Sequence, residues 1–236
     1  MLKSVFIPNQ YNSYAWANAL CLMLLLCLEA VEAYTVIFAY FLETIVIGAF
    51  NIIRMLMASK HDSSGNSIVF LVPFFIFHYG MFVAVQSVFA FALFSFSGQD
   101  LIKEPFDLID NYITILKLEG MAYILPLLIG TQLLKLIFDF ILSKKYMDFT
   151  ASEMMFKPYV RIVIQQFTVL IAMFFIVFSN SAVVAAILLI GIRTVVDLFM
   201  AAIRDNERVL NIMVDKLDNG KMPKSKLKKQ LLLFSE

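Results

Sequence analysis

Polar and ionisable side chains interrupt long apolar runs at several points of this 236-residue sequence. An ionisable group at the centre of a lipid bilayer costs at least about 2.5–3.5 kcal/mol on insertion scales, so such groups normally face a bundle interior or a cavity. Side chains of this kind bind ions or ligands, relay protons or begin a metal site. The residues are Glu43, Asn51, His78, Gln86, Gln132, Lys135, Asp139, Gln165, Gln166, Arg193 and Asp197.

Two pairs of these residues carry opposite charges at a spacing that lets the two charges of each pair neutralise each other. Lys135 and Asp139 stand four residues apart, and so do Arg193 and Asp197. This spacing places both members of a pair on one face of an α-helix. It therefore predicts an ion pair within each helix, which suits a structural role as well as a functional one.

Glu43 and His78 have no such partner in their own runs. Glu43, His78, Gln132 and Arg193 each fall near the middle of a different apolar run, and Gln166 lies somewhat nearer one end of its run. Helices packed as a bundle would bring these side chains to a common layer. We therefore predict one connected polar cluster, in which Glu43 pairs with Arg193 or hydrogen-bonds to His78.

The residue types leave several kinds of chemistry open. Glu43 and His78 are candidate metal ligands, although no third strong ligand accompanies them at the same depth. The same pair suits proton relay, because histidine titrates near physiological pH. Residues 70–96 are rich in phenylalanine, which packs against helices and lipid or lines a pocket for haem, quinone or lipid. The sequence contains no serine-hydrolase or nucleotide-binding motif.

The composition indicates the class of protein. Hydrophobic residues make up 61% of the chain and charged residues 16%, whereas soluble domains average about 45–50% and 25%. A chain of this length needs more polar surface than that to fold in water. The net charge of +1 does not suggest a nucleic-acid binder, and Cys21 and Cys27 are too few for a disulfide scaffold. We predict an all-α integral membrane protein.

The apolar runs predict helices, since each helix needs about 20 residues to cross a bilayer and barrel strands would alternate polar and apolar residues. The first run is interpreted as a retained helix in preference to a signal peptide, because Glu29 and Glu32 crowd the cleavage position. Pro158 suits the first turn of the fifth helix. Residues 1–206 are predicted to form a six-helix membrane domain, followed by a tail over residues 207–236. The six spans cover residues 14–28, 33–57, 67–96, 121–142, 158–178 and 182–203.

The basic residues predict the orientation of the bundle. Fifteen of the 19 Lys and Arg residues fall in the N-terminal segment, in the loops after the second and fourth spans, or in the tail. Arg54, Lys157 and Arg161 are counted among these loop residues. Only Lys103 and Lys117 lie on the other side. Both termini are therefore expected to be cytoplasmic.

Two segments are predicted outside the spans. Residues 100–119 combine acidic and apolar side chains in a pattern typical of an amphipathic helix on the outer surface, either a connector or a lid. The tail begins amphipathically and becomes lysine-rich, and such clusters attract anionic lipid headgroups. The usual excess of basic residues on the cytoplasmic side of a membrane protein explains the lysines of the tail equally well, and so does contact with a partner. Its lysines are Lys221, Lys224, Lys226, Lys228 and Lys229.

Three stretches of the chain carry a family resemblance. The first runs from Tyr40-Phe-Leu-Glu43 through Gly48 and Asn51 to Arg54, the second is Pro73-Phe-Phe-Ile-Phe-His78-Tyr-Gly80, and the third is Pro158-Tyr159-Val-Arg161-Ile-Val, followed by Arg193 to Asp197. In this order and spacing the chain resembles a bacterial polytopic membrane family catalogued as a domain of unknown function. The resemblance covers residues 12–204 and implies an inner-membrane protein.

The resemblance also implies a Glu/His-rich intramembrane site. Members of the family carry histidines at the positions of Gln86, Gln132 and Gln166, a set suited to a metal or a haem. Glutamine keeps the hydrogen bonding of these positions but not the ligand strength or the titration. This departure puts a metal site in doubt here, and no cofactor is predicted.

We expect a midplane site that binds or conducts a small ion or ligand, in one copy or in a homo-oligomer. One alternative is a metal- or haem-dependent intramembrane enzyme. The other is a structural or accessory subunit whose polar cluster only fixes helix packing. The residues expected to line the site are Glu43, Asn51, His78, Gln86, Gln132, Gln166, Arg193 and Asp197.

Overall fold

The structure is a computed structural model that describes residues 5–9, 12–61, 67–95, 101–179, 181–220 and 222–235, with side chains 173 and 176–179 left out. The described residues form helices, turns and loops without a strand. Most of the predicted spans agree with the observed helices within a few residues. The elements are α2 (Ser13–Cys27), α3 (Ala33–Ser59), α4 (Ile68–Ser95), α5 (Leu108–Leu116), α6 (Met121–Leu134), the π-helix η1 (Lys135–Leu142), the 3₁₀ turn η2 (Lys145–Met147), α7 (Ala151–Ser179), α8 (Ala182–Asp205), α9 (Glu207–Leu217) and α10 (Lys224–Phe234).

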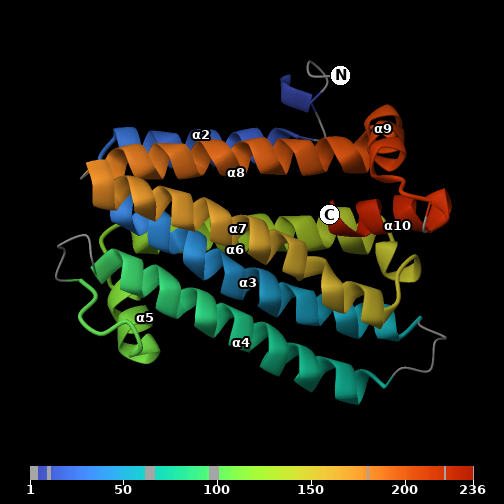
Figure 1. The fold of residues 1–236 in the computed structure, drawn as a ribbon, viewed down its shortest axis with the longest axis horizontal. Coiled ribbons are helices and arrows are strands. Elements are labelled where there is room, and N and C mark those ends of the chain that lie inside the picture. The colour runs from blue at the N-terminus through green and yellow to red at the C-terminus, as the bar shows by residue number, and fades with distance from the viewer. Residues whose placement is uncertain are drawn as a thin grey trace.

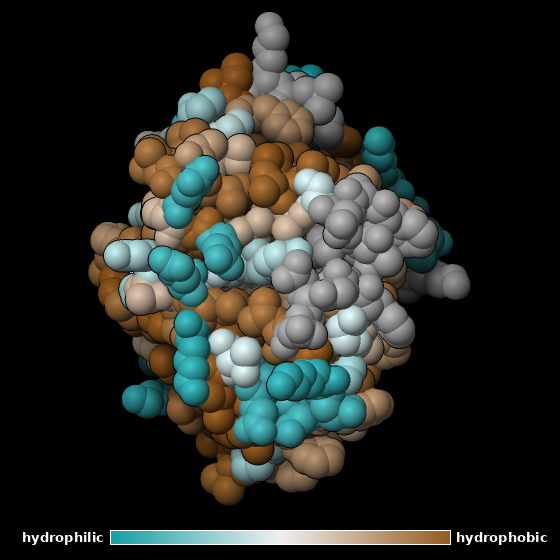
Figure 2. Space-filling model, turned by 90° about the vertical axis from the view of Figure 1, so that its left-hand side faces the viewer, coloured by the Kyte–Doolittle hydropathy of each residue, from teal (hydrophilic) through white to brown (hydrophobic). Residues whose placement is uncertain are grey.

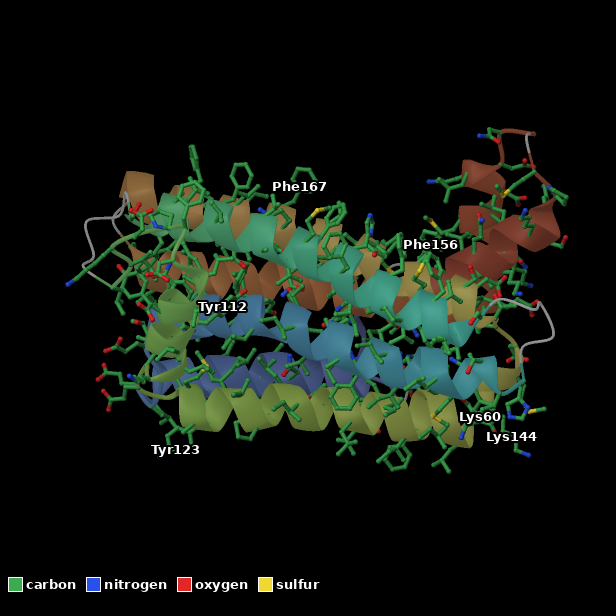
Figure 3. The ribbon with its side chains drawn as sticks, turned by 90° about the horizontal axis from the view of Figure 1, so that it is seen from below. Lys60, Tyr112, Tyr123, Lys144, Phe156 and Phe167 are labelled. Atoms are coloured by element: carbon green, nitrogen blue, oxygen red, sulfur yellow. The ribbon has the colours of Figure 1, made fainter. Side chains whose placement is uncertain are left out.

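The long helices run side by side along the long axis of the molecule (Figure 1). Helix α3 is central, because it packs against α4, α6, α7 and α8. Helix α5 caps one end of the bundle, here called the α5 end, and α9 and α10 lie at the other, here called the α10 end (Figure 1). Lys60 and Lys144, which follow α3 and η1, lie at the α10 end, opposite Tyr112 and Tyr123 (Figure 3). The end of α3 and the segment between η1 and α7 therefore lie at the same end of the bundle as the C-terminal helices (Figure 1, Figure 3).

Four helices are long and apolar enough to cross a membrane: α3, α4, α6 with η1, and α8. The surface of α4 suits contact with lipid, since Val69 is 79% and Phe77 75% exposed. Figure 2 looks onto the α5 end, where hydrophilic residues are spread over the face while hydrophobic residues form much of the outline. Helix α2 has only 15 residues, fewer than the about 20 that a span requires. The described part of the chain is thus all-helical, with four candidate spans.

Helix α7 begins seven residues earlier than predicted. Thr150 and Glu153 form a capping box: the backbone N–H of Thr150 donates to Glu153 Oε2 over 2.9 Å, and the backbone N–H of Glu153 donates to Thr150 Oγ1 over 3.1 Å. These reciprocal bonds satisfy N–H groups that a helix start leaves unpaired. Placing Pro158 in the first turn was therefore wrong, since it lies inside the helix.

A side chain from α3 compensates for Pro158. Proline lacks an N–H, so the carbonyl four residues earlier, that of Met154, loses its helical donor. Asn51 Nδ2 donates to the Met154 carbonyl over 3.0 Å. Asn51 thus joins α3 to α7 at the point where the proline interrupts the backbone ladder.

The two ends of the bundle are packed differently. The largest apolar cluster lies toward the α5 end and includes Phe38, Phe91, Phe94, Ile124 and Leu189, each at most 1% exposed. Buried charged side chains are concentrated between the middle of α3 and the α10 end. The interior is therefore mainly apolar in the α5 half, whereas the α10 half combines apolar clusters with buried charged side chains.

The segment predicted to be an amphipathic helix forms the short helix α5, which covers only the middle of residues 100–119. Its residue Ile115 is buried, whereas Ile109 and Ile113 are exposed on one face. Tyr112 ties α5 to α4 through a 2.7 Å hydrogen bond with Ser87 Oγ. Burial raises the pKa of Tyr112 to about 12, against the opposing effect of this hydrogen bond, so the phenol is neutral at physiological pH.

The segment predicted as a tail folds back onto the bundle. Helices α9 and α10 contact α8, and α10 also contacts α7. Their apolar residues Val209, Leu210 and Val214 join a cluster that includes Val5 from the chain start. The first described residues and α10 therefore lie at the same end of the bundle.

Candidate functional site

Glu43 is the centre of a buried polar network on four helices. Its carboxylate is 2% exposed and accepts hydrogen bonds from Arg193 Nη2 of α8, over 2.5 Å, and from Gln132 Nε2 of α6, over 3.1 Å. The predicted pairing of Glu43 with Arg193 is confirmed. Because a buried charge is tolerated only when paired and hydrogen-bonded, these contacts explain how a carboxylate stays inside the bundle.

Arg161 of α7 completes this network. Its Nη2 lies 3.2 Å from Asp197 Oδ1 and 3.6 Å from Glu43 Oε1. The ion pair predicted within α8 is also present, with Arg193 Nε 3.2 Å from Asp197 Oδ2. Two arginines thus bridge two carboxylates. Arg161 was counted among the basic loop residues although the predicted span 158–178 includes it. The capping box of Thr150 and Glu153, which starts α7 seven residues earlier and puts Arg161 well inside the helix, was the missed signal.

The backbone of α3 contributes additional acceptors to this region. Gln165 Nε2 donates to the carbonyl of Tyr40, and the Tyr40 ring lies 4.5 Å below the Arg193 guanidinium. A cation over an aromatic face is attracted by the ring quadrupole. Gln165 and Tyr40 therefore help to hold Arg193 against Glu43.

The second predicted ion pair, Lys135 with Asp139, is wrong. Asp139 Oδ2 instead accepts from Arg204 Nη1 over 2.9 Å. The physical reason is the π-helix η1, which begins at Lys135. A π-helix bonds i to i+5, so residues four apart are no longer aligned on one face. Among the described residues, Lys135 has no carboxylate within ion-pair distance.

A cavity of about 60 Å³ lies beside this network and is rich in basic side chains. Four basic residues and two acidic ones line it, and both acidic residues are already paired with arginine. Phe234 and Ser235, at the end of α10, form part of its wall. The charged lining residues are Arg54, Lys135, Lys157, Arg161, Asp139 and Asp197. Asn51 also lines the cavity, with its amide nitrogen already used by Met154.

Two smaller cavities share walls with this one. A cavity of about 30 Å³ reaches Glu43 and Arg193 near the middle of the bundle. A cavity of about 40 Å³ reaches Asn12 and Arg204 at the α10 end. Arg161 and Asp197 line all three. Since about 10–15 Å³ holds one water, the series has room for several waters or a small ion.

His78 does not join the network, so the alternative of a Glu43–His78 hydrogen bond is wrong. His78 Nδ1 lies 2.6 Å from the hydroxyl of Tyr159, and its ring stacks on Phe74 and packs against Phe82. Within the described part of the chain, no three His, Cys, Asp or Glu side chains gather in a way that could hold a metal. The candidate metal ligands Glu43 and His78 therefore do not form a joint site.

Gln86 and Gln166 are also separate from the network around Glu43. Both line a groove of about 390 Å³ between α4 and α7, whose other lining residues are apolar. The prediction of one connected cluster is thus wrong, because these residues lie in three separate places in the structure. They are the Glu43 network with Gln132, Arg193 and Asp197, the His78–Tyr159 contact, and the groove with Gln86 and Gln166.

Some of the lysines predicted to contact lipid or a partner form ion pairs within the protein. Lys224 lies 2.7 Å from Asp215, Lys228 3.2 Å from Glu207, and Lys229 2.8 Å from Glu153. Lys226 is exposed, and Lys221 lies outside the described residues. The ion pairs of α10 hold it against α7 and α9.

The chain was compared with known families, curated proteins and solved structures. A model for a family of unknown function, DUF6498, matches residues 1–223. The chain belongs to this family. This confirms the resemblance to an unknown-function family and extends it to nearly the whole chain. No curated protein and no solved structure matches the chain.

Proposed function

We propose that this family member binds a small inorganic anion in the cavity beside Lys135, as the substrate site of a membrane transporter or channel. The observation that carries the proposal is the basic lining of an interior cavity whose carboxylates are already paired. Asp139 is held by Arg204, and Asp197 by Arg161 and Arg193. Lys135, half-buried on the cavity wall, has no carboxylate of its own within the described residues.

Charge and size support an anion over other ligands. Interior ionisable groups normally pair with one another or mark ion pathways. A cation would meet four basic side chains in the cavity of about 60 Å³, whereas an anion would supply the charge that Lys135 lacks. The volume suits a halide or an anion of similar size and excludes a large organic substrate.

The arrangement of the cavities suggests the direction of access. The three cavities follow one another from Glu43 to the α10 end, while the α5 half of the interior is apolar. We infer that the short helix α2 and helix α7 cross the bilayer together with the four candidate spans, because both run alongside them and pack against α8 (Figure 1). This gives six spans with both termini cytoplasmic, in a bacterial inner membrane, so that the anion enters from the cytoplasm. This orientation rests on the basic residues of the loops at the α10 end. Exposed lysines of α10 would then face anionic lipid headgroups.

Thermal unfolding of the purified protein in detergent tests the binding step. A ligand that binds only the folded state raises the unfolding temperature as its concentration rises. At constant ionic strength, we expect chloride and nitrate to stabilise the protein relative to gluconate, which is too large for the cavity. Lys135→Gln should remove at least about 80% of this difference, by the loss of one charge-assisted contact.

Lys60→Gln is the matched control, since Lys60 is exposed at the same end of the bundle. It should keep the full response to chloride. Equal stabilisation by gluconate and chloride, or an unchanged response in Lys135→Gln, would contradict the proposal and leave the network as a packing feature. Chloride efflux from proteoliposomes then separates transport from binding alone.

A further inference from the structure

The groove between α4 and α7 lies on the outside of the bundle, away from the Glu43 network. Its apolar lining includes Phe82 and Phe89 of α4 and Phe167 of α7. Figure 3 shows Phe167 at the outer edge of the bundle beside α4. The groove volume of about 390 Å³ falls in the range of about 300–1,000 Å³ that is usual for ligand sites.

Gln86 is the unusual residue of this groove. It is 5% exposed, and neither its amide nitrogen nor its amide oxygen has a hydrogen-bond partner. Leaving a buried polar group unpaired costs about 1–3 kcal/mol, and buried groups in this state call for an explanation. Packing alone does not explain an amide here, because a methionine, which is as long as glutamine, would fill the same place.

Gln166 places a second amide on the opposite wall. Its Oε1 is buried without a partner, and no described residue hydrogen-bonds to its side chain. The two helices therefore each present one amide and at least one phenylalanine to the same groove. Such a lining combines an apolar surface with hydrogen-bond donors and acceptors on two sides.

The depth of these amides limits the ligand. At 1.5 Å per residue, Gln86 lies about 7 Å and Gln166 about 2 Å from the midpoints of their helices, which span Ile68–Ser95 and Ala151–Ser179. The hydrocarbon core extends about 15 Å to either side of its centre. The headgroup and ester oxygens of phospholipids lie outside that region, and so does most water. The ligand must therefore be soluble in the hydrocarbon core and must bring hydrogen-bonding atoms to that depth. A neutral molecule with carbonyl oxygens meets both requirements.

We propose that the α4–α7 groove binds the ring of an isoprenoid quinone, with Gln86 and Gln166 donating hydrogen bonds to its carbonyl oxygens and the phenylalanines packing on its faces. The ring is flat, uncharged and soluble in lipid, and its isoprenoid chain continues along the exposed apolar surface of α4. Only binding is proposed. The site is independent of the anion cavity, which faces the other side of α7.

Quinone binding can be measured with decylubiquinone added to the full-length protein in phosphatidylcholine nanodiscs. The readouts are the rise in unfolding temperature with quinone concentration and the peptides labelled by a photoreactive azidoquinone. Labelling is expected within residues 82–89 and 162–170. The double variant Gln86→Leu/Gln166→Leu should bind decylubiquinone at least about tenfold more weakly, through the loss of two hydrogen bonds.

Decylbenzene is the matched probe, because it has a ring and the same chain but no carbonyl oxygen. It should bind wild type and the double variant equally and more weakly than the quinone binds wild type. Gln230→Leu on α10 is the control variant and should retain quinone affinity. The proposal is overturned if decylbenzene binds wild type as tightly as decylubiquinone does, if the double variant keeps its quinone affinity, or if labelling falls on other helices. Those results would assign the groove to acyl chains or to another copy of the protein.

Discussion

Two adjacent glutamines on α7 face two different environments. Gln165 points into the bundle and donates to the Tyr40 carbonyl, whereas Gln166 lines the outer groove and leaves its Oε1 unpaired. Successive residues of an α-helix point about 100° apart, so one helix serves both regions. In the inner network the carboxylates pair with arginines. In the outer groove the side-chain amides of Gln86 and Gln166 have no hydrogen-bond partner among the described residues.

This difference separates stability from binding. Pairing within the network stabilises the fold, because each charge depends on its partner to remain buried. An unpaired amide destabilises the fold and is tolerated when a ligand supplies the missing bond. Substitutions in the two regions should therefore have opposite effects on unfolding, and this contrast can be tested from the largest effect to the smallest.

The largest loss of stability is expected for Glu43→Gln. The change leaves Arg193 without its 2.5 Å ion pair and removes a carboxylate near Arg161. Breaking a buried ion pair by removing one partner costs about 3–5 kcal/mol. Chemical unfolding in mixed detergent micelles measures the loss. Glu32→Gln, at an exposed carboxylate of the same chain, should change the free energy of unfolding by less than about 0.5 kcal/mol.

A second variant distinguishes pairing from packing at this position. Glu43→Gln combined with Arg193→Gln removes both charges, and it should recover at least half of the loss seen in the single variant. A double variant no more stable than the single one would show that Glu43 acts through its shape and not through its charge.

The next effect concerns Gly48 of α3, against which the Tyr79 ring of α4 packs closely. A Cβ on Gly48 would lie 2.5 Å from Cε1 of Tyr79, whose hydroxyl donates to the Thr44 carbonyl over 2.8 Å. Gly48→Ala should displace the Tyr79 ring and α4, at a cost of about 1–3 kcal/mol. The displacement should alter the outer groove and leave the inner network intact, so chloride stabilisation should persist while quinone affinity falls.

Gly80 of α4 is the matched control for Gly48. A Cβ on Gly80 meets nothing within 4 Å, so Gly80→Ala should be neutral or stabilise the helix by about 0.5–1 kcal/mol. Similar losses of stability for both variants would argue against close packing of Tyr79 as the cause.

The sequence predicted the helices well and the neighbours of the site residues only in part. Apolar run length is a local property, so most of the helices were located within a few residues, with the start of α7 as the exception. The α8 pair of Arg193 and Asp197 followed from spacing alone. The Lys135–Asp139 pair failed because a switch from α- to π-helix leaves no clear mark in the residue types. Gln132 and Gln166 were both assigned to one cluster, yet they separate because the faces of α6 and α7 point to different neighbours.

Arg161 shows a different kind of error. Thr150 and Glu153 have the spacing of a capping box, but the predicted helix start at Pro158 did not use it. Proline is tolerated inside α7 because Asn51, 103 residues away along the chain, donates to the exposed carbonyl. Long-range compensation of this kind cannot be deduced from one sequence, since it depends on which helices become neighbours.

A gain in stability is expected for Gln86→Leu. Leucine removes two unpaired polar atoms from an apolar groove, which should raise the free energy of unfolding by about 1–2 kcal/mol in the absence of quinone. Gln132→Leu is the counterpart in the inner network, where the lost bond to Glu43 should instead destabilise the protein. Thermal unfolding of both variants in quinone-free detergent compares them. Losses of equal size would remove the distinction between the two regions.

The smallest effect is expected at Glu153, which anchors α10 outside the spans. Partial burial raises the pKa of Glu153, but hydrogen bonds from Lys229 and Thr150 and the charge of Lys229 outweigh it and hold the pKa below its ordinary value of 4.5. A carboxyl whose pKa is depressed in the folded state contributes stability above its ordinary pKa and loses it as the pH falls through the folded value.

Docking of α10 should therefore be constant from pH 8 to about 5 and should weaken as the pH falls below about 4.5, by less than about 1 kcal/mol because the pair is partly exposed. Hydrogen exchange of the α10 amides measures the docking. Protection of these amides, relative to the intrinsic exchange rate at each pH, should be lower in Glu153→Gln at pH 7 and should no longer depend on pH. Glu207→Gln, which removes only the exposed partner of Lys228, should keep the pH dependence of protection. Because Phe234 and Ser235 form part of the wall of the proposed anion cavity, looser docking in Glu153→Gln should also speed chloride entry. An unchanged rate of entry in a variant with looser docking would show that the cavity is reached by a path that does not pass α10.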